Sequence, residues 1–542
     1  MHALFLLLSL VSVDGRQQHE GHAPAAEKPA ALMPGLGTLH HPIATRSAEA
    51  QRFFDQGLTL VYGFNHEEAV RAFRRAAALD PASPMPHWGI ALALGPNINL
   101  DVDPGREQSA YDEGQRARTL AASAPATERA YVDALIKRYS NDPKADLHAL
   151  AIQYKDAMRD LVKQYPDDLD AATLYAESLM DLNPWQLWST DGKPAEGTEE
   201  IVAVLESVLR RDARHIGANH YYVHAVEASK SPDRALPSAR RLETLVPAAG
   251  HLVHMPAHIY MRTGNYLGAV TANAKAAAVD RAYIKTRGAG GVYPSMYYNH
   301  NLDFLASAAM MSGQFKQAKQ AADLVVANTT PMLAAMPMLE PLGAKTIYVL
   351  VRFARWDEIL RLPQPDATHP LLKAMSHFGR GIAQAARGNL AEAEQERAAY
   401  AAAARTLPPD SDWGYNKAKD ILPIAEAALD GWIARARKDD QPAIAAWRRA
   451  VAAEDRTSYD EPPDWFYPTR ESLGAALLRA RRPTEAAHVF REDLARNPNN
   501  GRSLFGLWQA QLAARDPAAA ATQKQFKAAW SHADTRLRMA DF

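Results

Sequence analysis

Two pairs of histidines occur in the same arrangement, 34 residues apart. His220 and His224 form one pair in NHYYVHAVEAS, and His254 and His258 form the other in HLVHMPAHIYM. Residues four apart lie on one face of an α-helix, so each pair can direct two imidazoles at one point. Helical histidine pairs with this spacing are ligands in known zinc motifs. The two pairs therefore indicate a metal site shared by two helices.

Four further polar residues lie in register with these pairs. His251 lies three residues before His254, and Glu227 lies three residues after His224. Two more occupy matching positions in the next repeat, once an insertion of 15 residues is allowed for. Because neighbouring helices pack about 8–10 Å apart, these side chains can share a mononuclear or closely spaced dinuclear site. The predicted metal ligands are His220, His224, His251, His254, His258, His300, Asp303 and Glu227.

Ligand chemistry narrows the choice of metal without fixing it. Imidazole suits Cu, Zn, Fe and Ni, and we consider Cu, Zn or Fe for this site. The chain has no cysteine, so no thiolate ligand is available, although Met255 and Met261 keep Cu(I) open. Several imidazoles in one place would repel each other if charged and would need partners if neutral and buried. A metal ion meets both requirements, which favours it over a metal-free polar groove.

The 34-residue spacing matches the period of a helix–turn–helix repeat. The segment AQRFFDQGLTLVYGFNHEEAVRAFRRAAALDP places small residues where two helices would cross, an aromatic ring beside them and a proline at the end. These positions are Phe53, Gly57, Ala69, Phe73, Ala76 and Pro81. In this spacing the chain resembles tetratricopeptide repeat proteins, and weaker copies cover most of residues 45–535. The resemblance implies an all-α solenoid of helix pairs that forms a right-handed superhelix.

The resemblance also bears on the histidines and on possible partners. In this family the fifth and ninth positions of the first helix face a concave groove, and both histidine pairs fall on those positions. The family usually binds an extended peptide or a helix in that groove. A metal-free scaffold for a peptide or protein partner in the cell envelope is therefore the alternative function. Residues 40–99 also resemble predicted exported bacterial members of this family, and that likeness carries no activity with it.

Composition shifts suggest four segments. The apolar run from Ala3 to Val13 predicts a signal peptide at residues 1–15 and hence a periplasmic or secreted protein. Residues 16–44 read as a flexible linker. One repeat array follows at 45–365 and a second at 366–542, with a proline-rich junction between them. Insertions at 182–200 and 283–298 interrupt the first array, either as binding loops or as tolerated surface insertions.

Several function classes have no support in the sequence. The charge is balanced, with 61 basic and 62 acidic residues, so no electrostatic footprint for nucleic acid exists. No later apolar segment is long enough to predict a membrane span. Motifs of serine hydrolases, zincins, P-loop nucleotide hydrolases and dinucleotide-binding enzymes are absent from the sequence. Whether a metal site would serve binding, redox chemistry or metal-dependent catalysis is left open.

Overall fold

The computed structural model describes residues 30–288, 290–366 and 368–542. The predicted signal peptide at 1–15 lies outside the described residues, as do residues 16–29 of the predicted linker. The chain divides into two compact units. The first contains residues up to 255 together with 279–289, and the second contains 256–278 together with 290–542. Within the described ranges, no helix has the length and apolar character needed to cross a membrane.

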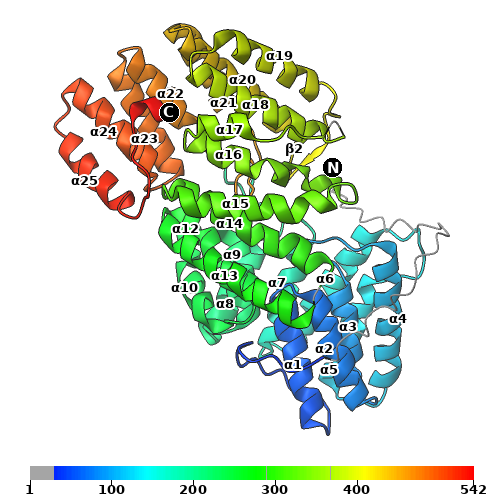
Figure 1. Ribbon diagram of the computed structural model, residues 1–542. Helices are drawn as coiled ribbons and strands as arrows, with labels where there is room; N and C mark the ends of the chain where they lie inside the picture. The colour runs from blue at the N-terminus through cyan, green and yellow to red at the C-terminus, as the bar shows by residue number, and fades with distance from the viewer. Residues whose placement is uncertain (1–29, 289, 367) are drawn as a thin grey trace. The chain divides into compact units, whose positions relative to one another are not determined.

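The first unit is a succession of helices (Figure 1), and the C-terminal end of α13 (Tyr266–Arg287) also belongs to it. Short 3₁₀ turns cover Ile136–Arg138 and Pro232–Ala235. The other helices of this unit are α1 (Ala48–Tyr62), α2 (His66–Leu79), α3 (Met85–Leu94), α4 (Pro104–Ala121), α5 (Ala126–Leu135), α6 (Leu147–Gln164), α7 (Leu169–Met180), α8 (Thr198–Arg211), α9 (Ile216–Glu227), α10 (Leu236–Leu245) and α11 (Gly250–His254).

The second unit is also helical, apart from one hairpin in which β1 (Asp412–Trp413) pairs antiparallel with β2 (Asn416–Lys417). A π-helical turn spans Tyr293–Tyr297, and 3₁₀ turns cover Thr330–Met332, Pro337–Ala344 and Met539–Asp541. Its other helices are α12 (Pro256–Thr263), α14 (Tyr298–Met311), α15 (Phe315–Thr329), α16 (Lys345–Arg352), α17 (Trp356–Arg361), α18 (Pro370–Ala386), α19 (Leu390–Ala404), α20 (Ala418–Ala436), α21 (Asp440–Glu454), α22 (Thr469–Arg479), α23 (Pro483–Arg496), α24 (Gly501–Ala514) and α25 (Ala519–Ala529). The predicted all-α fold is confirmed.

The helix pairs close on glycine–aromatic contacts in both units. On α1, a Cβ added to Gly57 would lie 2.5 Å from the Phe73 ring of α2, and one added to Gly89 of α3 would lie 2.6 Å from the same ring. On α22, a Cβ at Gly474 would lie 2.5 Å from the Phe490 ring of α23. No side chain fits at these glycines without displacing a ring. The pairs are therefore of the tetratricopeptide type that the spacing predicted.

Residues 30–44, the described part of the predicted linker, pack against the first unit. The Met33 N–H donates to Gln56 Oε1 of α1 at 2.7 Å, and the Ala248 N–H donates to the Gly35 carbonyl at 3.0 Å. Leu36 and Ile43 are buried. These contacts make the stretch an ordered arm, which we call the N-terminal arm (residues 30–44).

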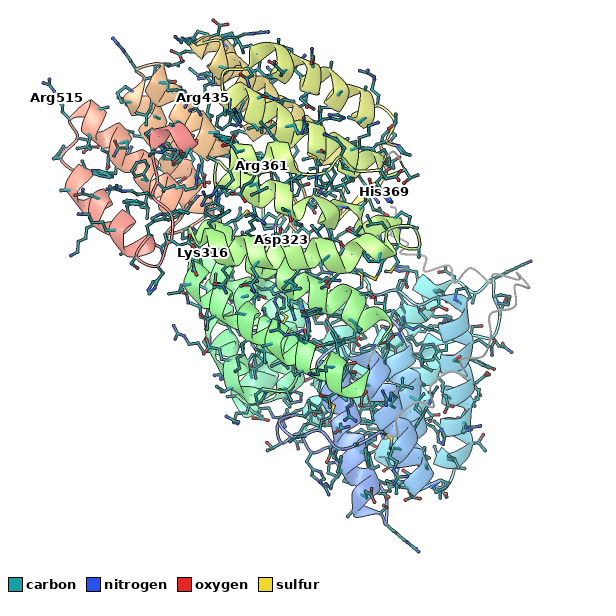
Figure 2. All side chains as sticks on the ribbon, viewed as in Figure 1. Lys316, Asp323, Arg361, His369, Arg435 and Arg515 are labelled. Carbon is teal, nitrogen blue, oxygen red and sulfur yellow. The ribbon has the colours of Figure 1, made fainter. Side chains whose placement is uncertain are left out.

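The proline-rich segment at 361–370 does not separate the packed units. Helix α18 follows it and packs back on α16, where a Cβ at Gly379 would lie 2.5 Å from Ile347. Arg380 Nη1 donates to the Leu360 carbonyl of α17 at 3.3 Å. Arg361 and His369 mark the two sides of this segment in Figure 2. Residues on both sides of the segment belong to the second unit, so helix packing continues across the prolines.

The two predicted insertions differ from each other. Residues 283–298 were expected to be irregular, but α13 runs on to Arg287 and the π turn leads directly into α14 at Tyr298. The break in helical structure is thus much shorter than the glycine and proline content suggested. The other insertion, between α7 and α8, is a non-helical loop at residues 181–197.

Candidate metal site

Three of the predicted ligands meet inside the first unit. His220 and His224 lie on α9 and His251 lies on α11, and all three are buried. One ring nitrogen of each lies within 4.8 Å of the others. His220 Nε2 and His251 Nε2 are 3.1 Å apart. The four-residue spacing and the repeat register therefore bring three of the eight predicted ligands together.

Hydrogen bonds at Nδ1 define the tautomers of two of these rings. His220 Nδ1 lies 2.6 Å from the Tyr62 carbonyl, which can only accept, so Nδ1 carries the proton. His224 Nδ1 lies 2.7 Å from Glu227 Oε1, and an ionised carboxylate likewise requires a donor. In their neutral forms, both rings then carry the lone pair on Nε2. Carbonyl and carboxylate partners of this kind orient histidine ligands in metal proteins.

The spacing and surroundings of the three rings suit a transition metal ion. Nitrogen ligands of a tetrahedral ion with bonds of about 2.0–2.1 Å lie about 3.3 Å apart, close to the His220–His251 separation. The Phe64 ring lies 4.6 Å from the His220 ring, 6.0 Å from His224 and 5.3 Å from His251, measured between centroids. An apolar wall of this kind keeps water from the rings and strengthens metal–ligand electrostatics.

The remaining predicted ligands are divided between the two units. Glu227 belongs to the first unit and contacts His224, as described above. His254 also belongs to the first unit, with its ring 5.7 Å from that of His251. In the second unit, the His258 and His300 rings are 6.0 Å apart. Asp303 Oδ2 pairs with Lys345 Nζ at 2.9 Å, so a charged partner already holds the predicted carboxylate ligand.

A second polar cluster in the first unit fastens the N-terminal arm. His41 Nδ1 donates to Asp170 Oδ2 at 2.8 Å, and Tyr62 Oη donates to Asp170 Oδ1 at 2.6 Å. Burial opposes ionisation of Asp170, but His215 and His41 outweigh it and hold the pKa of that carboxyl below its ordinary value. Burial lowers the pKa of His41, but the hydrogen bond and charge of Asp170 raise it, and the net effect is a raised pKa. No periodicity in the sequence ties His41 to the two histidine pairs, so the sequence did not indicate this cluster.

The carboxylate oxygens of this second cluster that could bind a metal already accept hydrogen bonds within the protein. His41, Asp168 and Asp170 place one ligand atom each within 4.8 Å of the others. However, Asp168 Oδ1 caps α7 by accepting from the Ala171 N–H, and its Oδ2 accepts from Tyr131 Oη at 2.9 Å. Both oxygens of Asp170 also have donors. We therefore assign this cluster to structure.

His66 shows how strongly this interior disfavours charge. It is the first residue of α2. Burial, together with Arg106 and Arg138, lowers the pKa of His66 to about 3. The ring is therefore neutral at physiological pH, as an imidazole must be to bind a metal. His66 does not join the three-histidine cluster.

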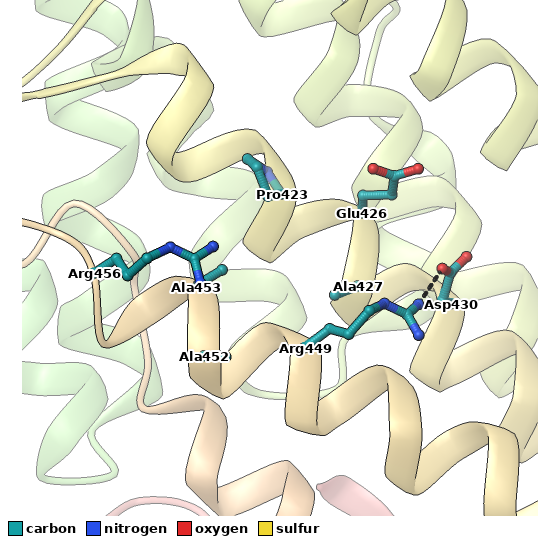
Figure 3. Close-up of a pocket in the computed structure, with 8 residues that line it drawn as sticks. All are labelled: Pro423, Glu426, Ala427, Asp430, Arg449, Ala452, Ala453 and Arg456. Atoms are coloured by element: carbon teal, nitrogen blue, oxygen red, sulfur yellow. Dashed lines mark hydrogen bonds and ion pairs between the residues drawn. The ribbon is translucent and has the colours of Figure 1, made fainter.

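A surface groove of ≈ 370 Å³ in the second unit has a different character. It lies between α20 and α21, and Figure 3 shows Arg449 reaching across it to Asp430. Arg449 Nη2 donates to Asp430 Oδ2 at 2.7 Å. Its lining includes Glu426 and Arg456 but no histidine. This open groove of mixed charge offers none of the predicted chemistry.

Several solved structures are distantly similar to this chain. No family model matches the chain, and no curated protein matches it. Similar solved structures include the APC/C hetero-tetramer Cut9–Hcn1, with 12% identity over 90% of this chain and 89% of that one and a TM-score of 0.28. A human IFIT1 dimer with m7Gppp-AAAA has 12% identity, coverage of 90% and 91%, and a TM-score of 0.32. Yeast Tom70 has 11% identity, coverage of 88% and 99%, and a TM-score of 0.32. Scores this low leave the helix pairing of the chain itself as the basis for its fold.

Proposed function

We propose that this protein binds a transition metal ion, Cu, Zn or Fe, through His220, His224 and His251. The observation that carries the proposal is the convergence of three buried imidazoles, with a ring nitrogen of each within 4.8 Å of the others. Two of the rings have their outer nitrogen held by Tyr62 and Glu227, as oriented metal ligands do. The proposal covers metal binding and leaves the subsequent chemistry open.

Elemental analysis tests this proposal directly. Purified protein is exposed to Zn²⁺ or Cu²⁺, desalted and analysed for bound metal. About one tightly held ion per chain is expected for a site of this kind. Changing His220, His224 or His251 to Ala should remove most of it, because each change deletes one of three protein ligands. A wild-type chain that retains far less than one ion would overturn the proposal and favour the metal-free scaffold for a peptide or protein partner.

We also propose that the protein is exported to the periplasm or secreted. The support is the apolar run from Ala3 to Val13, which has the length of a signal-peptide core. Mass spectrometry of the mature native protein should find an N-terminus near residue 16. Intact Met1 in the mature chain would contradict export by cleavage.

A further inference from the structure

The loop at residues 181–197 reaches the three-histidine cluster. The Trp185 indole lies edge-to-face against the His224 ring, with centroids 5.7 Å apart and planes at 76°. The same indole donates from Nε1 to Asn99 Oδ1 at 3.0 Å. Trp185 therefore connects one of the proposed metal ligands to the segment between α3 and α4.

The backbone of Trp185 is in an unusual conformation. Its φ is 59°, in the left-handed region that bulky side chains rarely adopt. Such a conformation persists only where surrounding contacts determine it, and it occurs preferentially at binding sites and ligand clamps. The contacts with His224 and Asn99 are therefore part of what holds this residue in place.

The rest of the loop is fixed to the helix that carries the ligands. Trp188 Nε1 donates to the Ala225 carbonyl of α9 at 2.7 Å. That carbonyl is available because the Ser229 N–H bonds to the Val226 carbonyl at the end of the helix. The Leu187 carbonyl accepts from Thr198 Oγ1 at 2.9 Å. The loop is thus anchored one residue beyond His224, which sets the position of Trp185.

We infer that Trp185 is a gate over the metal site, which slows the release of the ion and the entry of competing ligands. This inference rests on the proposed metal site and adds a control on access to it. Trp185 supplies no ligand atom, so it acts as a positioning residue through its contact with His224. The indole must leave the His224 ring before a competing ligand can approach from that side.

The rate of metal release tests the gate. Wild-type and Trp185→Ala proteins are loaded with Zn²⁺, and the release of Zn²⁺ into excess EDTA is followed. Both should hold the same amount of zinc, because all three histidines are intact. Release should be at least about tenfold faster without the indole, since a ring contact and a hydrogen bond that hold the site closed are both lost. Gln186→Ala, which changes the exposed neighbour in the same loop, should release zinc at the wild-type rate.

Asn99→Ala provides a second variant that leaves every aromatic ring in place. It removes only the acceptor of the indole N–H and should accelerate release by a smaller factor. Equal release rates in all variants, with normal zinc content, would overturn the gate and leave the metal site standing. A wild-type chain without bound zinc would overturn both. If Trp185→Ala loses zinc while Asn99→Ala releases it at the wild-type rate, Trp185 serves to fold the site and the gate is wrong.

Discussion

The two units share the same helix pairing but satisfy their buried polar groups in different ways. In the second unit, buried Glu471 accepts hydrogen bonds from Arg352 Nη2 at 3.0 Å, Arg502 Nε at 2.9 Å and Asn500 Nδ2 at 2.8 Å. The two arginines outweigh burial and lower the pKa of Glu471, so the carboxylate stays charged. The role of this ion cluster is structural, because Glu471 joins Arg352, Arg502 and Asn500 through direct hydrogen bonds.

The three-histidine cluster of the first unit instead gathers groups of one kind. His220, His224 and His251 bring imidazole nitrogens together, with a carbonyl and a carboxylate bound to the outer nitrogens of two of them. Two neutral imidazoles whose nitrogens face each other can share one proton in a single hydrogen bond. One metal ion, in contrast, can be bound by a nitrogen from each of the three rings. The difference indicates that the repeat supplies the framework, while the side chains on its helices decide which kind of polar cluster forms.

The largest effect is expected from breaking the ion cluster of the second unit. Glu471→Ala leaves Arg352 and Arg502 buried without their shared carboxylate and should destabilise the protein by about 3–5 kcal/mol. Urea unfolding followed by circular dichroism measures this. Bound metal per folded chain should remain at the wild-type level, and a loss of metal in the folded protein would contradict the separation of the two roles.

A pH experiment addresses the same ion cluster. Burial, with a contribution from Glu471, raises the pKa of Asp493 to about 6. A raised carboxyl pKa favours folding when protonated, so this contribution is complete below about pH 4 and is lost as the pH rises to about 6. From the ordinary value near 3.8, the loss amounts to about 3 kcal/mol.

Asp493→Asn removes that titration. Relative to the wild type, the free energy of unfolding of the variant should therefore increase by about 3 kcal/mol between pH 4 and pH 7. Unfolding curves at several pH values measure the difference, in which contributions common to both proteins cancel. A difference that is constant with pH would show that Asp493 does not titrate in this range.

The metal site should make stability depend on ion concentration. An ion that binds only the folded state stabilises it by about 2.7 kcal/mol when the free ion is at 100 times its dissociation constant. The melting temperature of the wild type should rise with added Zn²⁺, and that of His251→Ala should not. An equal rise in both proteins would place the responsible zinc elsewhere.

The sequence predicted the framework and part of the site, for identifiable reasons. Periodicity is local, so Gly57 and Phe73 predicted a helix pair, and His220 with His224 predicted a shared face. His251 followed because neighbouring repeats stack in register. The sequence therefore placed these three imidazoles and Glu227 in one register, but it gave no sign of the Tyr62 carbonyl that binds His220.

Contacts between segments far apart in the chain were not accessible in the same way. The Tyr62 carbonyl that orients His220 is 158 residues away in the chain, and a backbone acceptor has no sequence signature. Trp185 lay in a recognised insertion, but its contact with His224 depends on how that loop is anchored. Asp303 is a different case. Its position in the repeat was recognised in the sequence, but the sequence did not show that Lys345 would pair with its carboxylate.

The smallest effect is expected from changing histidines outside the three-histidine cluster. Such variants are also the most specific control for that cluster. His377 Nδ1 pairs with Glu396 at 2.7 Å and His488 Nε2 pairs with Glu492 at 3.2 Å, both in the second unit. Neither histidine belongs to the three-histidine cluster. His377→Ala should cost about 1 kcal/mol, because Glu396 keeps Arg380 Nε as a partner at 2.7 Å. The double variant with His488→Ala should hold the wild-type amount of Zn²⁺ and release it at the wild-type rate. Loss of metal from this variant would mean that histidine number, and not the geometry of His220, His224 and His251, determines binding.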